Sequence, residues 1–500
     1  MTIRGKAFSG TPVDAALMNP WVTPPPLNER GVILGIDLRT GRVIYFDPWD
    51  LKSRELITGL IFLALGERNA GKSSLFIMLV MRLMTRQAGV IDGVPQQMTT
   101  RMTTRKALET EEGEGGSVEF KPMNDHLSGI FLDLQSAGGI NIFDPRMGMT
   151  EFDILETAIN ICELANNDQP LRNFQPLVLQ VAVNKMLRSY GKVASPDVLE
   201  LVARGLDLTD VSDYFKASNS RALNHFTTAL GQQPELAEQL KLETERPANI
   251  PAADFERDKM YVSQQLGRVL RGDFGQIFGG EKSLYDVLSQ PMVTISMAGL
   301  NLKARSLFES MLWKWATTAQ LRGDHQLIPG INGADEEHEG LTSLMYTRFW
   351  ASSVQKARAV RTFDMRAMQY LRQLTEAGSA DSEIRALARQ IALGVGAYFI
   401  GRQPLNDPTV LDEITNLGVS DLNAEFTTQL RTGQFMLKVP GHPGVFFQAQ
   451  LTPTELRLAK TNQSTDAMNT FVPALTHETL RWREQRYGSV ELGALLHETV

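Results

Sequence analysis

The stretch of sequence that decides the fold is Gly66-Glu67-Arg68-Asn69-Ala70-Gly71-Lys72-Ser73. It fits the phosphate-binding pattern G-x-x-x-x-G-K-[ST]. The residues before it, 60–65, are all apolar and predict a short buried strand. The largely apolar residues 74–84 after it predict a buried helix. A glycine loop between a strand and a helix is the context in which this pattern binds phosphate, so we predict a nucleotide site here.

Each part of this loop has a chemical role. Its glycines let backbone N–H groups surround phosphate oxygens, and the N-terminus of the following helix adds partial positive charge. The Lys72 ammonium would reach the β- and γ-phosphates, and the Ser73 hydroxyl would ligate Mg²⁺. The residues predicted to hold the nucleotide are Gly66, Asn69, Ala70, Gly71, Lys72, Ser73 and Ser74.

The bulk composition is that of an ordinary globular protein. The 500 residues are 43% hydrophobic and 21% charged, with a net charge of −7. This charge argues against coating of nucleic acid or anionic membrane by the whole surface, although a local basic channel stays compatible with it. The single cysteine, Cys162, excludes an intrachain disulfide and fits a reducing compartment. No apolar run is long enough to span a bilayer and no signal peptide is recognised, so we expect a cytoplasmic protein.

Along the chain, strand patterns alternate with helical ones. Two hairpins are predicted, at 31–46 and at 434–449, and further strands at 140–145, 292–297 and 397–403. Between the predicted strands at 140–145 and 292–297, helical periodicity dominates five segments, namely 152–165, 172–189, 196–205, 220–231 and 252–272. Helices are also expected at 304–321 and over most of 340–394.

This order predicts an α/β fold, a doubly wound core interrupted by one all-α insertion. The expected units are an extended N-terminal arm (1–30), the first part of the core (31–150), the insertion (151–285), the second part of the core (286–460) and a helical tail (461–500). The Pro-rich arm is either a disordered tail or a strap onto a neighbouring subunit.

Hydrolysis of a bound nucleotide needs an acid that holds Mg²⁺ through water and a second group that polarises the attacking water. Asp335 and Glu336 are the predicted pair, with Asp335 serving the metal and Glu336 the water. Glycines and a proline in 329–334 predict a poor buried strand before them, so an acidic surface loop is the alternative. Asp133, preceded by the apolar residues 130–132, is a rival metal acid.

Gln403 ends the predicted strand 397–403, where a glutamine can sense the γ-phosphate or orient water. We therefore group it with Lys72 and Glu336 as catalytic candidates. An ordinary polar strand end is the alternative.

A basic stretch has three possible roles: a solvated helix face, a channel lining for a polyanion, or a source of an arginine for a neighbour's nucleotide. Its cations are Lys356, Arg358, Arg361, Arg366 and Arg372, with only Asp364 against them. Arg402 and Arg431 are further candidates for an arginine that acts on a neighbouring subunit.

The order of these features resembles the conjugative type IV secretion ATPases, the motor class related to the HerA and FtsK pumps. Besides the phosphate loop, the likeness rests on the hairpin sequence at 35–43, Ile-Asn-x-Phe-Asp-Pro at 140–145, the segment 272–280, Asp-Glu-x-His at 335–338, the glutamine at 403 with Pro-Leu-Asn-Asp after it, and 432–441. It covers roughly residues 31–460. The chain departs from the family in lacking the large N-terminal domain, in the glycine-rich approach to Asp335, and in having Arg402-Gln403 where a Thr-Gln pair is usual.

This resemblance implies a RecA-like core that hydrolyses ATP with Mg²⁺. It implies a hexameric ring with ATP at subunit interfaces, working with the membrane channel proteins of a conjugation apparatus from the inner face of the membrane. Direct membrane insertion is not expected, and DNA is a possible partner. A DNA-translocating pump of the same superfamily and a nucleotide-binding scaffold with little turnover are the alternative functions.

Overall fold

A computed structural model describes most of the core. The described residues are 27, 30–85, 89–91, 94–96, 98–104, 120–137, 139–141, 143–144, 150–166, 169–172, 174–190, 195–214, 250–271, 275, 277, 280, 282–288, 290–322, 330–335, 337–356, 361–379, 382–404 and 407–459. The predicted arm, the helix at 220–231 and the C-terminal tail therefore lie outside the described residues, except for Leu27 and Arg30. Among the described helices, none combines the length and apolar character that crossing a membrane requires.

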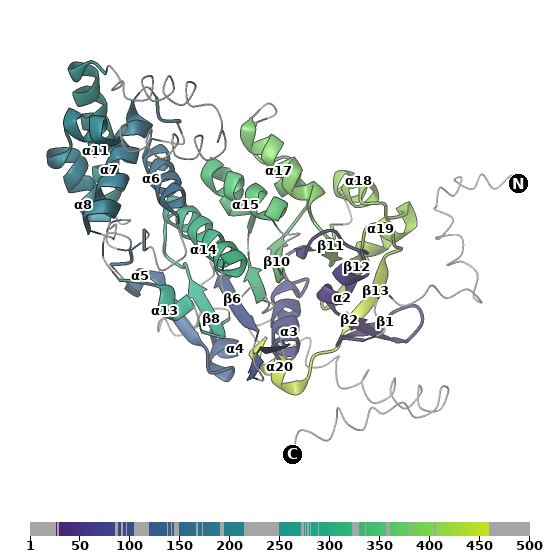
Figure 1. The fold of residues 1–500 in the computed structure, drawn as a ribbon. Helices are drawn as coiled ribbons and strands as arrows, with labels where there is room; N and C mark the ends of the chain where they lie inside the picture. Colours follow the sequence, from purple (N-terminus) through teal and green to yellow (C-terminus); the bar gives the residue numbers. More distant parts are fainter. Residues whose placement is uncertain are drawn as a thin grey trace, which may run out of the picture.

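The centre of the molecule is one eleven-stranded sheet (Figure 1). Seven strands run parallel to their neighbours, in the order β11-β3-β10-β9-β6-β8-β7. Their bounds are β11 Ala397–Ile400, β3 Ile61–Leu65, β10 Thr362–Met368, β9 Gly330–Ala334, β6 Thr99–Thr104, β8 Met292–Ser296 and β7 Ile130–Asp133. Because the strands are parallel, their carboxyl ends meet at one edge of the sheet.

Both predicted hairpins are present and extend this sheet beyond β11. The antiparallel strands follow in the order β12-β13-β1-β2, and their bounds are β12 Gln434–Lys438, β13 Val445–Ala449, β1 Val32–Asp37 and β2 Val43–Phe46. The N-terminal and C-terminal hairpins thus complete one sheet edge together. A separate two-stranded ribbon pairs β4 Gly89–Ile91 with β5 Val94–Gln96.

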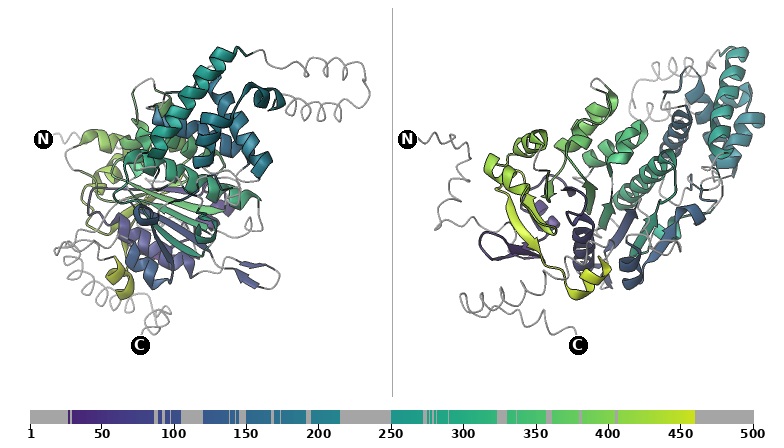
Figure 2. Two further views of the ribbon diagram at one scale, coloured as in Figure 1. Left: turned by 90° about the vertical axis from the view of Figure 1, so that its left-hand side faces the viewer. Right: turned by 180° about the vertical axis from the view of Figure 1, so that it is seen from behind.

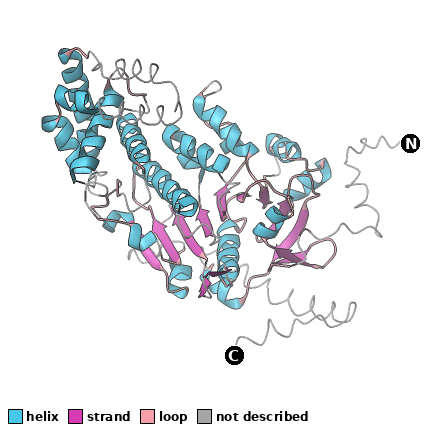
Figure 3. Ribbon diagram, in the orientation of Figure 1, coloured by secondary structure: helices cyan, strands magenta, loops and turns pink. Residues whose placement is uncertain are grey.

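Helices cover both faces of the sheet, as Figures 1 and 3 show. One face carries α3 Lys72–Met84, α4 Lys121–His126 and α20 Pro453–Leu458. The other carries α14 Leu302–Arg322, α15 Leu344–Lys356, α16 Arg372–Thr375, α17 Glu383–Leu393, α18 Pro408–Asn416 and α19 Asp421–Thr427. Strand β3 illustrates the reason, since Phe62 and Ala64 belong to the core beneath α3, whereas Ile61, Leu63 and Leu65 belong to the core beneath α15 and α17. Strand β3 is buried on both faces and is accordingly apolar throughout.

A group of helices gathers beside the end of the sheet that is formed by β8 and β7 (Figure 2). It comprises α6 Glu151–Ala165, α7 Gln175–Tyr190, α8 Ser195–Glu200, the π-helical turn Leu201–Gly205, α11 Ala252–Arg271 and α13 Tyr285–Leu288. Its buried apolar side chains form one cluster with β8 and α14. Helix α6 begins at Thr150, whose hydroxyl accepts from the Asp153 N–H while the Asp153 carboxylate accepts from the Thr150 N–H. The remaining short helices are α2 Pro48–Ser53, α5 Leu134–Ala137 and the 3₁₀ segment Glu337–Thr342.

Strand predictions fail at three places, one of which is the buried strand β6, where the sequence predicts no strand. Residues 140–145 are predicted to form a strand, but at the described positions 140, 141, 143 and 144 the structure has isolated bridge residues, with Ile140 paired to Lys282, and no strand. The region 340–394 was expected to be helical, yet it contains the fully buried strand β10. Two charged residues, Asp364 and Arg366, make its sequence unlike that of a buried strand. They can be buried because they pair with one another on one face, with Nη2 and Oδ2 3.0 Å apart.

The segment before Asp335 forms a complete strand, β9, in which every residue is buried. The glycine at position 333 has a packing reason. A Cβ at Gly333 would lie 2.5 Å from the Sδ and Cε atoms of Met102 on β6. Phe76 of α3 also approaches the same position, at 3.6 Å. Glycine in this strand therefore marks a close approach of neighbouring side chains.

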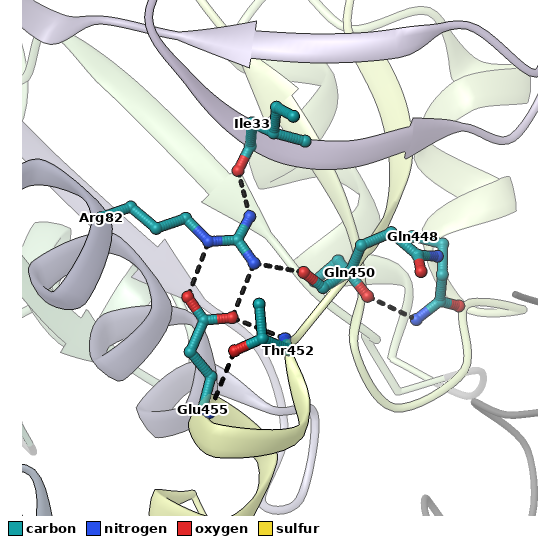
Figure 4. A network of polar contacts seen from close by, with 7 residues as sticks. Ile33, Arg82, Gln448, Gln450, Thr452 and Glu455 are labelled. Carbon is teal, nitrogen blue, oxygen red and sulfur yellow. Dashed lines mark hydrogen bonds and ion pairs between the residues drawn. The ribbon is translucent and has the colours of Figure 1, made fainter. Parts of the chain in front are cut away.

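The end of helix α3 is fixed by the guanidinium of Arg82 (Figure 4). Its Nε and Nη2 donate to the two carboxylate oxygens of Glu455 at 2.7 and 2.6 Å, and the remaining N–H groups donate to the carbonyls of Ile33 and Gln450. Glu455 is also the third residue of the capping box of α20. Arg82 thus ties the helix that follows the phosphate loop to both terminal parts of the described chain.

Candidate functional site

The predicted phosphate loop connects β3 to α3 and needs its two glycines. Gly71 precedes the helix with φ +95°, in the left-handed region that glycine favours, and Gly66 has φ +155°. Space is also limited, since a Cβ on Gly71 would lie 3.1 Å from the backbone nitrogen of Gly433. A Cβ on Gly66 would lie 3.1 Å from that of Ala70. The backbone itself therefore forms the inner surface of the loop.

Three neighbouring segments hold the loop in place. The Gly66 N–H donates to the carbonyl of Gln369, which follows β10, at 3.0 Å. The Glu67 N–H donates to the carbonyl of Arg402, which follows β11, also at 3.0 Å. On the third side, Gly433 N–H donates to Ala70 C=O at 3.1 Å, and the Thr432 hydroxyl donates to the carbonyl of Asn69 at 3.0 Å.

Lys72 lies folded over this loop. Its Nζ donates to the carbonyls of Gly66 and Glu67 at 2.7 and 2.9 Å. Ser73 and Ser74 are half-buried in the first turn of α3, and that turn contains no acidic residue to compete with a phosphate. Glycines that leave the backbone accessible, a lysine above the loop and a helix N-terminus without an acidic residue together fit a nucleotide phosphate group.

Asp335 directly follows β9 and is 2% exposed. In the sheet, Ala334 pairs with Arg366 on β10, and Arg366 pairs with Leu63 on β3, so the carboxyl end of β9 is level with the strand that enters the loop. Two strand spacings separate β9 from β3, about 10 Å. Period-two alternation puts position 335 on the same face as Ile331 and Gly333, which is the face that α3 covers.

The rival acid occupies a different part of the molecule. Asp133 ends β7, the last strand of the sheet, five strand positions from β3 or roughly 24 Å. Its Oδ1 accepts from the backbone N–H of Gln135 at 3.3 Å, which caps a short helix. Glu336 lies outside the described residues, and so do the side chains of Glu337 and His338.

The oxygens of Ser73 and Asp335 suit Mg²⁺, which is commonly held by one or two protein oxygens together with substrate phosphates. A hydroxyl at Ser73 and a carboxylate at Asp335 provide such a set. Within the described ranges, no group of three or more His, Cys, Asp or Glu side chains is assembled that could hold a metal by itself.

The arrangement can be compared with known proteins. VirB4 of Thermoanaerobacter pseudethanolicus matches with a TM-score of 0.59 and 13% identity, over 86% of this chain and 99% of that chain. The chain has the fold of VirB4. The plasmid coupling protein TrwB in complex with ADPNP gives a TM-score of 0.49 at 13% identity, over 80% of this chain and 87% of that chain. TrwB in complex with ADP and Mg²⁺ gives 0.49 at 12% identity, over 90% and 97%.

No protein-family model matches the sequence, and no curated protein does. The predicted α/β P-loop NTPase core is confirmed by the VirB4 fold. The resemblance noted in the sequence is confirmed at the level of the fold, because the chain shares the fold of VirB4 over most of its length.

Within this VirB4-like fold, the predicted Gln403 is 2% exposed and lies beyond β11. Its amide Nε2 donates to the carbonyl of Gly401 at 3.1 Å, and its backbone N–H donates to the carbonyl of Thr427 at 3.2 Å. Both contacts tie it to the protein on the β11 side of the loop, away from Asp335.

Sequence reasoning missed another glutamine, Gln369. It directly follows β10, the strand between β3 and β9, and is only partly buried. Its carbonyl accepts from Gly66, and its backbone N–H is held by the Oε1 of Gln373 at 2.9 Å. A glutamine directly after a strand would be the sequence signal for such a residue, but the sequence predicts helices, not a strand, over most of 340–394.

The basic stretch does not form one cationic face. Arg366 is fully buried, donates to the Tyr346 hydroxyl at 2.6 Å and stacks over Trp350 at 4.4 Å. Arg372 pairs with Asp407 at 2.8 Å. Arg361 is exposed at the amino end of β10, whereas Arg358 and the side chain of Lys356 lie outside the described residues. The interpretation of a solvated helix face is therefore wrong for Arg366, which is buried on strand β10.

Proposed function

We propose that this chain is an ATP-hydrolysing motor of a conjugative or type IV secretion-like apparatus. The observation that carries this proposal is the placement of Asp335, a buried carboxylate level with the phosphate loop and two strands from it. A loop alone binds nucleotide, whereas hydrolysis also needs an acid at this edge of the sheet. The fold shared with VirB4 over most of the chain supports the class of motor.

The chain's own groups would divide the work as follows. Backbone N–H groups of Asn69, Ala70 and Gly71 and the N-terminus of α3 bind phosphate oxygens, and Lys72 moves from the loop carbonyls to the β- and γ-phosphates. Ser73, with Ser74 beside it, and Asp335 orient Mg²⁺, which when bound would neutralise charge on the phosphates. Glu336 accepts the proton of the attacking water.

Gln369 is a better candidate than Gln403 for contact with the γ-phosphate. It directly follows β10, the strand between β3 and β9, and its carbonyl accepts from the N–H of Gly66 in the loop. Gln403 lies on the other side of β3 and already donates to Gly401. We therefore propose Gln369 as the residue that senses the γ-phosphate or orients water, and assign Gln403 to support of the loop.

A hexameric ring with ATP at its subunit interfaces is part of the proposal, with membrane channel proteins as partners at the cytoplasmic face of a membrane. The exposed side chain of Arg431 lies next to Thr432, which contacts the phosphate loop, so Arg431 is our candidate for an arginine that acts between subunits. A DNA pump remains the competing outcome. The main reason for a scaffold without turnover, a broken strand before Asp335, is removed by the buried strand β9.

Two matched substitutions test the assignment of the metal acid. We expect Asp335→Asn to lower the ATP hydrolysis rate at least about 100-fold, because the carboxylate that orients Mg²⁺ is lost. Asp133→Asn, at the far edge of the sheet, should leave the rate within about twofold of wild type. The opposite ranking would contradict the proposed site. Native mass measurement with ATP tests the ring, and hydrolysis that rises on adding DNA and falls steeply with salt would favour the DNA pump.

A further inference from the structure

An ion pair at the phosphate loop involves a residue that belongs to the loop itself. Arg402 Nε lies 3.1 Å from Glu67 Oε2, and both side chains are about one-third exposed, at 37% and 30%. The same two residues also meet through their backbones, because the Glu67 N–H donates to the Arg402 carbonyl at 3.0 Å. Arg402 therefore contacts Glu67 at two separate points.

The position of Glu67 is electrostatically unfavourable for a nucleotide site. It is the second residue of the loop, and its carbonyl accepts from the Lys72 Nζ at 2.9 Å. Because Glu67 belongs to the loop that would surround the phosphates, its carboxylate adds negative charge beside the proposed site. A like charge in this place opposes binding unless another group compensates it.

Arg402 is held where it can provide that compensation. The preceding residue, Gly401, packs directly against the loop, since a Cβ there would lie 3.2 Å from the Cβ of Ala70. Gly401 N–H donates to the carbonyl of Leu65, the last residue of β3, at 2.7 Å. Strand β11 therefore presents Arg402 to the loop of the same subunit.

We propose that Arg402 is a positioning residue that neutralises Glu67 within its own subunit, so that the phosphate loop can accept a polyanionic nucleotide. This inference rests on the proposed nucleotide-binding function and adds a residue to it. It also assigns Arg402 to its own subunit's loop rather than to a neighbour's nucleotide.

A double-mutant cycle on the full chain tests this role, with the Kd of a fluorescent ATP analogue as the readout. We expect Arg402→Gln to weaken binding roughly tenfold at low salt, because the Glu67 charge is then uncompensated beside the bound phosphates. Glu67→Gln alone should not weaken binding, and the double variant should return to within about threefold of wild type. Arg402→Lys should recover most of the affinity because it restores the charge.

Salt dependence separates charge compensation from a merely structural effect. The loss in Arg402→Gln should shrink as ionic strength rises, since exposed charges are screened over about 10 Å at 0.1 M salt. Arg257→Gln, which removes an exposed arginine 2.9 Å from Asp254 on the remote helix α11, is the matched control and should leave the Kd unchanged.

Two results would overturn the inference. Binding by Arg402→Gln within twofold of wild type would mean that Glu67 needs no compensation. A double variant as weak as Arg402→Gln would mean that Arg402 acts on the nucleotide directly. Failure of the wild-type chain to bind the analogue would instead count against the proposed function itself.

Discussion

The Arg82–Glu455 pair offers the clearest stability prediction, because its geometry defines what each substitution removes. In wild type, Glu455 accepts two charge-assisted hydrogen bonds from Arg82, and the side chains are 16% and 4% exposed. Glu455→Gln keeps the shape but retains one acceptor oxygen and no charge. The substitution removes one charge-assisted bond of about 1.5–3 kcal/mol together with the ionic attraction to Arg82, so it costs about 2–3 kcal/mol after allowance for partial exposure.

Hydrogen exchange at helix α20 measures this cost locally. The amides of Leu456 and Ala459 donate to the carbonyls of Thr452 and Glu455 at 2.8 and 2.9 Å, so they report opening of this helix. A loss of 2–3 kcal/mol corresponds to exchange that is about 30- to 150-fold faster.

Asp50→Asn is the matched control for this substitution. Its pair with Arg54 is 37% and 44% exposed, so the loss of stability should stay below about 1 kcal/mol. Equal effects of the two substitutions would refute the reasoning that burial gives the Arg82–Glu455 pair its value.

Three further predictions follow from single residues. Gly333→Ala should destabilise the fold by about 1–3 kcal/mol in urea unfolding, because the new methyl meets Met102, and Met102→Val in the same chain should recover part of the loss. Burial raises the pKa of the Cys162 thiol, so a thiol reagent should modify it only when the protein unfolds, and rapid labelling of native protein would contradict this. Desolvation holds the pKa of His442 below its ordinary 6.5. The unfolded chain therefore protonates this histidine at a higher pH than the folded protein does, and stability falls as the pH drops below about 6.5. His442→Gln should flatten that fall in thermal unfolding, and an unchanged pH profile would count against this account.

The parts of the fold that the sequence predicted are those with local causes. The loop 66–73 and both hairpins carry their turn residues and apolar flanks within about twenty residues, so pattern alone suffices for them. Strand β9 is different, because its Gly333 is explained by the approach of Met102, which lies more than two hundred residues away in sequence. Strand β10 was missed because Asp364 and Arg366 satisfy each other inside the protein, which no propensity reveals.

The candidate site shows the same division. Lys72 and Ser73 follow from the motif, whereas the choice between Asp335 and Asp133 depends on strand order, which a single sequence does not display. Gln369 was overlooked for the same reason, since its importance comes from the position of β10 between β3 and β9. Motif chemistry was therefore predictable, and the arrangement of separate strands around it was not.

The most direct test of the motor proposal is the steady-state rate of ATP hydrolysis by the purified chain and by Glu336→Gln, with Lys72→Ala as the binding-deficient reference. We expect wild-type turnover, a rate at least about 100-fold lower in Glu336→Gln with ATP binding retained, and loss of binding in Lys72→Ala. Equal turnover in wild type and Glu336→Gln would contradict the assignment of the catalytic acid and, with it, the proposed motor site.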